Sequence, residues 1–287
     1  MSETKEFLAP LVPYVVALTC EARFETVSMG TRVQYEVASG FIVEVDSAWY
    51  WVTAAHVFSE YFKTRFDNGW RFSHWQFMAG ENQERSLIPF EFTNFDDGNN
   101  QFTLNTHGLV VQFQDDLVIE QGIDYAYFRL SEEVRSELEL AGAKALTNEH
   151  WGVEIDHSEE GKVDYQLLGY AKELAQDSLE EREIRATLLR IQVTRTDRTT
   201  NPQVEGSRPY LFEGQHFNFR DVDDDFKTIN GLSGGPIFRV WRDLDDRVCL
   251  TIEAIFTKSG NYSMRMQGFK IKPVIGSIRT NYPVASI

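Results

Sequence analysis

The sequence predicts an all-β fold, and three observations support this prediction. Short runs rich in Val, Ile, Phe, Tyr and Thr recur along the 287 residues. Turn-forming clusters, such as DDGNN at 96–100, separate these runs. Helical patterns are few. Many short strands at this spacing are typical of an antiparallel sandwich or barrel.

The strand-like runs can be taken in chain order. A short lead-in at the N-terminus precedes a first strand, which we expect at 14–18. Further strands are expected at 33–45, 49–57, 102–113, 124–130, 164–170, 186–196, 234–241 and 248–258. Each run is apolar or alternating and rich in β-branched or aromatic side chains, which suit a pleated surface.

Three segments carry helical signals. Residues 131–146 begin with Ser131, a good N-cap, and two glutamates follow in the first turn, so we expect a helix near the boundary between two halves. The charged segment 171–184 predicts an exposed helix or an insertion loop. Residues 268–282 predict a short C-terminal helix, although they contain a proline and a glycine.

The charge balance excludes several classes of protein. Asp and Glu total 44 against 28 for Lys and Arg, so the formal net charge is −16. Such a chain is a poor general nucleic-acid binder, because that affinity comes from neutralising phosphates, and it is equally unsuited to anionic lipid. No apolar run reaches the roughly 18 residues that a membrane span needs. We therefore expect neither nucleic acid nor a membrane as a partner.

The N-terminal segment and the cysteines together predict a cytoplasmic location. Residues 7–20 are apolar, but they follow an acidic start and contain two prolines, which does not suit a signal peptide. Cys20 and Cys249 lie far apart in the sequence and outside any metal-binding spacing. Two isolated thiols fit a reducing compartment better than a disulfide framework.

The stretch INGLSGGPIF at 229–238 surrounds one serine with small residues. Gly231, Gly234, Gly235 and Pro236 disfavour both a helix and a central strand, so Ser233 lies in a turn or where backbone approaches something closely. One interpretation is a tight turn between two strands. The other is a turn that exposes a nucleophilic hydroxyl and directs backbone N–H groups at an oxyanion. This stretch alone does not decide between them.

The motif G-x-S-x-G also occurs at the nucleophile of α/β-hydrolases, but two features exclude that fold. In those enzymes the catalytic histidine follows the serine in the chain, whereas all six histidines here precede Ser233. The nucleophile there also leads into a helix, whereas the residues after Pro236 predict a strand. A base for Ser233 must therefore lie upstream.

His56 is the candidate base among the six histidines. It follows a strand-like run and sits in TAAHV, where small residues leave space around the ring, although a buried structural histidine is the alternative. The stretch EHWGVEIDH at 149–157 suggests a metal site, but it lacks the helical spacing of H-E-x-x-H. The acidic run at 221–225 lacks the pattern of a calcium loop and is interpreted as a solvated loop. We therefore expect no metal site.

Asp124 is the candidate carboxylate partner for His56. Most aspartates between His56 and Ser233 lie in loop-like sequence, whereas Asp124 begins the hydrophobic run DYAYFRL. An acid at that position is costly unless it is partnered. The alternative is an aspartate that caps a turn after Gly122.

Taken together, TAAHV, GIDYAYFRL and GLSGGPIF closely resemble the histidine, aspartate and serine motifs of the chymotrypsin-like (trypsin-like) serine protease family, in the order of that family. SGFIVEVDSAWYWVTAAH also resembles the hairpin that precedes the family's histidine, with Gly40 where the chain turns into it. The resemblance spans roughly residues 14–280. It implies two antiparallel six-stranded β-barrels and a short C-terminal helix. The first barrel would comprise residues 1–135, with His56 and Asp124, and the second residues 136–287, with Ser233.

The resemblance also implies a mechanism and a set of functional residues. Ser233 would attack a peptide carbonyl of a polypeptide substrate to form an acyl-enzyme, with His56 as the general base and Asp124 as the residue that orients it. The N–H groups of Gly231 and Ser233 would form the oxyanion hole. No metal or organic cofactor is implied.

Some features depart from the digestive and clotting enzymes of the family. Leu232 replaces the usual aspartate before the serine, extra length falls at 60–100 and 171–210, and no IVGG-type processed N-terminus is present. These traits resemble intracellular or bacterial members. They suggest regulation by an activating or targeting partner or by a conformational change, including a protease that is latent until its partner binds. The alternative is a catalytically inactive trypsin-like scaffold that acts as a binding module.

The substrate-binding residues also follow from the resemblance. Lys227 occupies the base of the primary specificity pocket, and its walls align with Thr257, Lys258 and Ser259 and with the segment around Gly268. A lysine at the base would favour an acidic side chain in the substrate. Alternatively, Lys227 points to solvent and pairs with the acidic run at 221–225.

Overall fold

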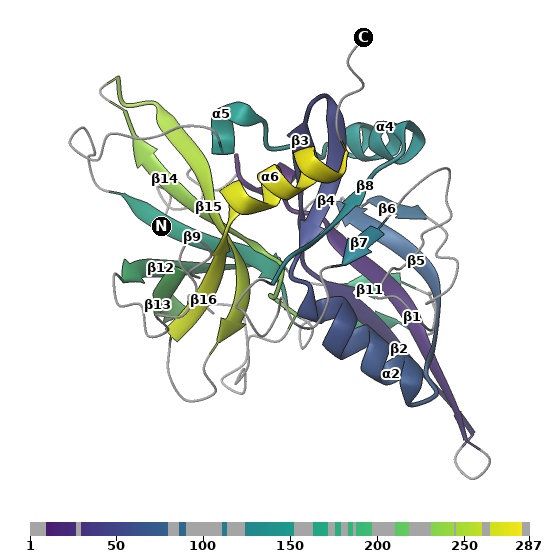
Figure 1. Ribbon diagram of the computed structural model, residues 1–287. Helices are drawn as coiled ribbons and strands as arrows, with labels where there is room; N and C mark the ends of the chain where they lie inside the picture. The colour runs from purple at the N-terminus through teal and green to yellow at the C-terminus, as the bar shows by residue number, and fades with distance from the viewer. Residues whose placement is uncertain are drawn as a thin grey trace.

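The strands of the chain form two halves that lie side by side (Figure 1). The structure is a computed structural model that describes residues 10–26, 30–79, 86–89, 111–113, 124–151, 163–171, 176–178, 183–185, 188–196, 210–217, 231–243, 245–259 and 265–282. These ranges are mostly strand, which confirms the all-β prediction, and the last of them ends in a short helix, as expected.

The N-terminal half contains two four-stranded antiparallel sheets. One has the order β2 (Gly30–Ala38), β1 (Ala17–Thr26), β5 (Arg71–Ala79) and β6 (Ser86–Pro89). The other has the order β3 (Phe41–Val45), β4 (Ala48–Thr53), β8 (Ala126–Arg129) and β7 (Val111–Phe113). Within the described ranges this half is therefore not a closed six-stranded barrel, and that part of the prediction is not confirmed.

The two sheets meet at Gly40, where β2 leads into β3. The N–H of Val16 donates a 3.0 Å hydrogen bond to the carbonyl of Gly40. The indole of Trp51 packs on Gly40 so closely that a Cβ there would overlap it, and its Nε1 donates a 2.8 Å bond to the carbonyl of Val16. Glycine is therefore required at this corner because backbone and indole approach each other.

The hairpin expected before His56 is present. β3 and β4 pair from Phe41 opposite Val52 to Val45 opposite Ala48. The connecting residues Asp46 and Ser47 have φ of 51° and 67°. Two consecutive positive φ values are typical of a type I′ turn, whose twist matches that of the flanking strands.

Six strands close a barrel in the C-terminal half, and Figure 1 shows this barrel beside the two sheets. Its order is β12 (Leu188–Thr196), β13 (Tyr210–Phe217), β16 (Arg265–Lys270), β15 (Val248–Ser259), β14 (Pro236–Arg242) and β9 (Asp164–Tyr170). β13 was not predicted. Gly214 interrupts its apolar pattern, and the register with β12 shifts beside this glycine, as at a β-bulge.

Helix α4 (Glu132–Leu140) confirms the N-cap predicted at Ser131, whose Oγ accepts a 3.3 Å hydrogen bond from the N–H of Val134. The helix ends at Leu140 instead of continuing to 146. Gly142 has a φ of +83°, and the N–H of Ala143 bonds to the carbonyl of Leu138, which together form a Schellman C-cap. Residue 135, where the sequence predicts the boundary between halves, lies inside this helix.

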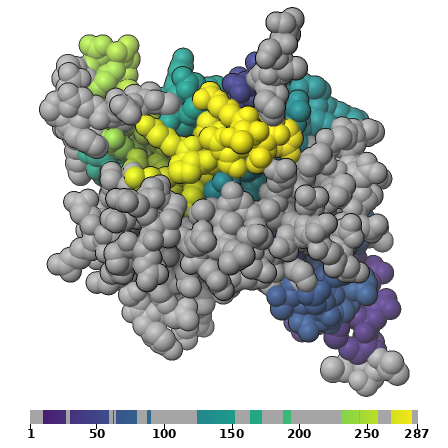
Figure 2. All heavy atoms as spheres, in the orientation of Figure 1, coloured from purple at the N-terminus to yellow at the C-terminus, as the bar shows by residue number. Residues whose placement is uncertain are grey.

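Helix α6 (Ile271–Asn281) follows the barrel in the sequence but packs on the N-terminal half as well. It buries one apolar face, formed by Ile271, Val274, Ile275 and Ile278. The hydroxyls of Ser277 and of Tyr127 in β8 lie 3.1 Å apart, and Asn281 Nδ2 donates to the Tyr127 hydroxyl. In Figure 2 the outer side of this C-terminal segment is exposed across the junction of the two halves.

Several predicted elements differ from the observed ones at their ends. Residues 12–14 form a 3₁₀ turn, η1 (Val12–Tyr14), because Pro13 suits the start of a helical turn, and β1 begins only at Ala17. The segment 171–184 was predicted as a helix or a loop. Its described part contains β10 (Gln176–Ser178), which pairs with β11 (Glu183–Arg185). The strands were missed because a charged composition indicates exposure to solvent but not the backbone conformation.

A helical segment after β4 was missed. The strand expected at 49–57 ends at Thr53, and a π-helix, η2 (Val57–Phe62), continues into α2 (Lys63–Asp67). Phe58, Phe62 and Phe66 follow one another at intervals of four residues, which is a helical period, and Phe58 and Phe62 are buried. The other short helix, α5 (Asn148–Trp151), follows α4.

Candidate active site

His56 and Asp124 are brought together by the pairing of β4 with β8. Thr53 lies opposite Ala126 in this antiparallel pair, so the residues after Thr53 lie beside those before Ala126. Asp124 Oδ2 lies 2.6 Å from His56 Nδ1, and Asp124 Oδ1 accepts a 3.0 Å hydrogen bond from the backbone N–H of His56. Both oxygens of one carboxylate therefore bind one residue.

This contact defines what the imidazole can do. The two side chains are 22% and 15% exposed, so the pair is largely buried but still reachable from solvent. Because the carboxylate accepts from Nδ1–H, the neutral ring has its basic lone pair on Nε2. Such a ring can accept a proton at Nε2 while the carboxylate stabilises the imidazolium that results.

Ser233 lies at the second position of a tight turn. The N–H of Gly235 donates a 2.8 Å bond to the carbonyl of Leu232, and Gly234 at the third position has a φ of +90°. A positive φ at this position is typical of a type II turn and favours glycine. The Leu232 side chain is buried in the barrel core, where the aspartate found in the digestive enzymes would be costly.

The turn is held on the barrel by backbone hydrogen bonds to Phe256 in β15. The N–H of Gly234 donates to the carbonyl of Phe256, and the N–H of Phe256 donates to the carbonyl of Gly235, each at 2.8 Å. On its other side, a Cβ at Gly234 would overlap Thr53 Oγ1 and the carbonyl of Ser39. The turn that carries Ser233 therefore packs against Thr53, three residues before His56.

The backbone N–H groups of Gly231 and Ser233 donate no hydrogen bond to another described residue. Both residues are partly exposed.

Among the residues expected to line a specificity pocket, Thr257 and Gly268 lie beside Phe256, the residue that binds this turn. Thr257 is buried and follows Phe256, which binds the serine turn, and the chain continues along β15 through Lys258 and Ser259. Gly268 in β16 pairs with Phe256. Lys227 and the acidic run at 221–225 lie outside the described residues.

One site residue was missed in the sequence. Ser39, between β2 and β3, donates a 2.7 Å hydrogen bond from Oγ to the carbonyl of Gly231. Its only signal in the sequence is its place before Gly40 in an apolar run. A lone small polar residue gives no indication of a partner 192 positions away.

The possible metal site at 149–157 is not supported in its described part. The N–H of Thr147 donates a 3.0 Å bond to His150 Nδ1, and the Tyr14 hydroxyl lies 3.3 Å from His150 Nε2. Burial lowers the pKa of His150 below its usual value, so the ring is neutral. No cluster of three or more metal-ligating side chains occurs among the described residues, which do not include Asp156 and His157.

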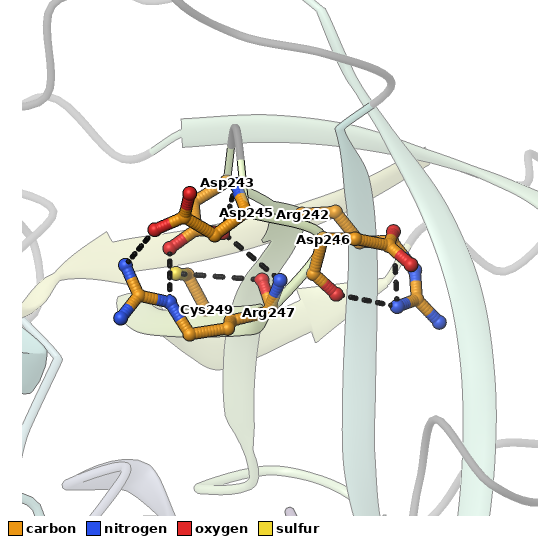
Figure 3. A network of polar contacts seen from close by, with 6 residues as sticks. All are labelled: Arg242, Asp243, Asp245, Asp246, Arg247 and Cys249. Carbon is orange, nitrogen blue, oxygen red and sulfur yellow. Dashed lines mark hydrogen bonds and ion pairs between the residues drawn. The ribbon is translucent and has the colours of Figure 1, made fainter.

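A further polar network closes the β14–β15 hairpin (Figure 3). Asp243 accepts hydrogen bonds from the backbone N–H and from Nε of Arg247, and the backbone bond is the main reason that its pKa is lowered. Burial is the main cause that raises the pKa of the nearby Cys249 thiol. The network lies at the opposite end of β14 from Ser233, so it stabilises the hairpin and does not belong to the candidate site.

One negative result concerns membranes. No helix among the described residues has both the length and the apolar character needed to cross a bilayer.

Comparison with solved structures finds resemblance to serine proteases. A thermostable serine protease from an extremophilic microorganism gives a TM-score of 0.38 at 14% identity, over 90% of this chain and 91% of the other. A scabies mite inactivated protease paralogue gives 0.44 at 10% identity, over 94% and 92%. A Glu endopeptidase gives 0.41 at 11% identity, over 98% and 94%.

Comparison of the sequence itself gives no match. Neither a family model nor a curated protein matches this chain.

Proposed function

We propose that this protein is a serine endopeptidase that hydrolyses peptide bonds of polypeptide substrates through an acyl-enzyme. One observation carries the proposal: the two-oxygen contact of Asp124 with His56, beside the turn that presents Ser233. A histidine oriented by a carboxylate and placed near a serine hydroxyl is the arrangement that nucleophilic catalysis by serine requires.

In the proposed mechanism, Ser233 Oγ attacks the substrate carbonyl and His56 Nε2 takes its proton. His56 then gives this proton to the leaving amine, and a water molecule hydrolyses the acyl-enzyme by the same route. Asp124 keeps the ring in the required tautomer and stabilises the imidazolium. The N–H groups of Gly231 and Ser233 donate to the oxyanion of the tetrahedral intermediate, where each such donor is worth about 3–4 kcal/mol.

The fuller architecture belongs to the same proposal. We propose a trypsin-like arrangement in which His56 and Asp124 come from the first half and Ser233 from the second, with the boundary near residue 135. The proposed cytoplasmic location rests on Cys20 and Cys249, two thiols that lie far apart in the sequence and outside any metal-binding spacing. We also propose that the enzyme is regulated by a partner or by a conformational change.

The specificity of the proposed enzyme depends on Lys227. If it forms the base of the pocket bounded by Thr257 and Gly268, the enzyme prefers Glu or Asp before the scissile bond. A substrate-library profile of the wild type and of Lys227→Ala tests this. Loss of an acidic preference in the variant supports the pocket role, and efficient cleavage after Arg refutes it.

A fluorophosphonate probe tests the proposed function directly, because it labels only an activated serine. The wild type is expected to be labelled, whereas Ser233→Ala and His56→Ala are not. Ser136→Ala is the matched control, since Ser136 lies on the exposed side of α4 and donates to the carbonyl of Glu132 in the same helix. Equal labelling of Ser233→Ala and the wild type would refute the proposal. An unlabelled but folded wild type would favour the inactive scaffold instead.

A further inference from the structure

Ser39 lies where three segments of the chain meet. It connects β2 to β3 in the N-terminal half, and its side chain is completely buried. Its Oγ bonds to Gly231 beside the serine turn and to Tyr170 at the end of β9. The contact is close, since a Cβ on the neighbouring Gly169 would lie 2.9 Å from Ser39 Oγ.

The hydroxyl of Ser39 has a single proton, and the distances show where it goes. Ser39 Oγ lies 2.7 Å from the carbonyl of Gly231 and 3.4 Å from that of Tyr170, so it donates to Gly231. It accepts a 2.8 Å bond from the N–H of Tyr170. The carbonyl of Gly231 thus receives its hydrogen bond from the opposite half of the molecule.

The hydrogen bond from Ser39 fixes the peptide plane that joins Gly231 to Leu232, because the Gly231 carbonyl lies in that plane. The N–H of Gly231 lies in the preceding peptide plane, and the N–H of Ser233 lies in the following one. The later plane is held by the bond from the Gly235 N–H to the carbonyl of Leu232. Because Gly231 has a φ of +89° and no Cβ, its own backbone does little to hold the middle plane in one orientation.

The same residue is also tied to the histidine segment. Thr53 Oγ1 donates a 2.7 Å hydrogen bond to the carbonyl of Ser39, and Thr53 is completely buried. Thr53, Ser39 and Gly231 therefore form a chain of two hydrogen bonds that begins three residues before His56 and ends two residues before Ser233.

We propose that Ser39 is a positioning residue that holds the Gly231 peptide so that the N–H groups of Gly231 and Ser233 point to one oxyanion. This inference rests on the proposed function. Ser39 acts through the backbone of Gly231 and contacts neither the substrate nor the reacting atoms. A small misplacement of such donors lowers catalysis strongly, because they must meet the oxyanion at hydrogen-bonding distance.

The kinetic test uses Ser39→Ala, with p-nitrophenyl acetate and a fluorophosphonate as probes. Neither depends on a specificity pocket. The variant is expected to lose about 10- to 100-fold in kcat and in labelling rate, less than the roughly 10²–10³-fold cost of removing a donor outright. Its KM and the pH profile of kcat stay unchanged, because the contact between His56 and Asp124 is untouched.

Thr19→Val is the matched control for the loss of a buried hydroxyl. Thr19 is also completely buried, and its Oγ1 donates to the carbonyl of Gln76 within the sheet of β1 and β5, which does not contain the candidate site. This variant is expected to lose stability but to keep the kcat of the wild type. If Ser39→Ala does not fold, Ser39→Cys replaces it, because its S–H group is only a weak hydrogen-bond donor.

Amide hydrogen exchange gives a second readout that needs no activity. The N–H groups of Gly234 and Gly235 are bonded in the wild type, and they are expected to exchange faster in the Ser39 variant but not in Thr19→Val. Unchanged exchange, an unchanged kcat, or an equal loss of kcat in both variants overturns the inference. If the wild type shows no activity, the proposed function fails, and the exchange result alone decides whether Ser39 holds the turn.

Discussion

Asp124 binds His56 through both of its carboxylate oxygens, one on the ring and one on the backbone. Oδ2 lies 2.6 Å from Nδ1, and Oδ1 lies 3.0 Å from the backbone N of the same residue. The backbone bond decides which oxygen faces the ring. The same backbone bond therefore restricts how a side chain substituted at position 124 can be oriented.

Asp124→Asn is expected to lower kcat about 10⁴-fold while leaving the fold intact. The amide oxygen of the asparagine takes the bond from the His56 backbone N–H, so its NH₂ group faces Nδ1. The ring then has its lone pair on Nδ1 and its proton on Nε2, which is the wrong tautomer for a base. Hydrolysis of p-nitrophenyl acetate measures the loss. Asp245→Asn, in the exposed β14–β15 hairpin, is the control and keeps full activity, whereas a loss of less than tenfold in Asp124→Asn would contradict the proposed role.

Gly234→Ala is expected to lower the free energy of unfolding by about 2–4 kcal/mol and to remove activity. The added Cβ overlaps Thr53 Oγ1 and the Ser39 carbonyl, and the φ of +90° is strained for alanine. Gly276→Ala in α6 is the matched control, since its Cβ meets nothing within 4 Å, and it gains about 0.5–1 kcal/mol. Urea unfolding measures both changes. Equal effects of the two substitutions would show that the serine turn is not tightly packed.

Acidification is expected to destabilise the protein through His150. Burial keeps its folded-state pKa below the ordinary value of 6.5, so the unfolded chain binds more protons below that pH. The stabilisation is complete above pH 6.5 and is lost as the pH falls toward the folded-state pKa. Protonation of Nδ1 also breaks the bond from the Thr147 N–H. Thermal unfolding between pH 7 and pH 5 measures the effect. In His150→Asn, whose amide oxygen can accept the same bond, the fall in Tm is expected to be smaller, and an identical pH profile would argue against this cause.

Alkali is expected to destabilise the protein through Tyr282. Burial, with further contributions from Tyr127 and Tyr50, raises its pKa from 10 to about 12. A raised phenol pKa stabilises the fold below pH 10, and this contribution is lost as the pH rises from 10 to 12. Tyr282→Phe should show a shallower loss of stability over that range in urea unfolding. If the variant loses as much stability as the wild type over this pH range, other groups cause the alkaline loss.

The sequence predicted the local elements better than the assembly of the N-terminal half. β9 matches the predicted range 164–170, and the cap at Ser131 is where it was expected, because both depend on neighbouring residues. The two four-stranded sheets were not foreseen. They depend on Trp51 packing over Gly40 and on the bond between Val16 and Gly40, which link residues distant in the sequence.

In the candidate site too, features that depend on neighbouring residues were predicted, and a contact between distant residues was not. Sequence motifs singled out His56, Asp124 and Ser233 because each has a distinctive neighbourhood. Ser39 escaped notice because its function, as proposed here, arises from a contact with Gly231 in the other half of the chain. The helix after β4 was missed for another reason: its phenylalanines also fit a continuation of the strand.

Helix α6 has a consequence for the order in which the protein is made and folds. One hydrophobic cluster contains Val43 and Val52 from the first half together with Phe238, Ile252 and Ile275 from the second. On the ribosome, the first half emerges long before α6, so this apolar surface stays uncovered until α6 has been translated. The first half therefore reaches its final packing only after α6 has emerged, and a nascent chain truncated before Ile271 is expected to depend on chaperones for its solubility.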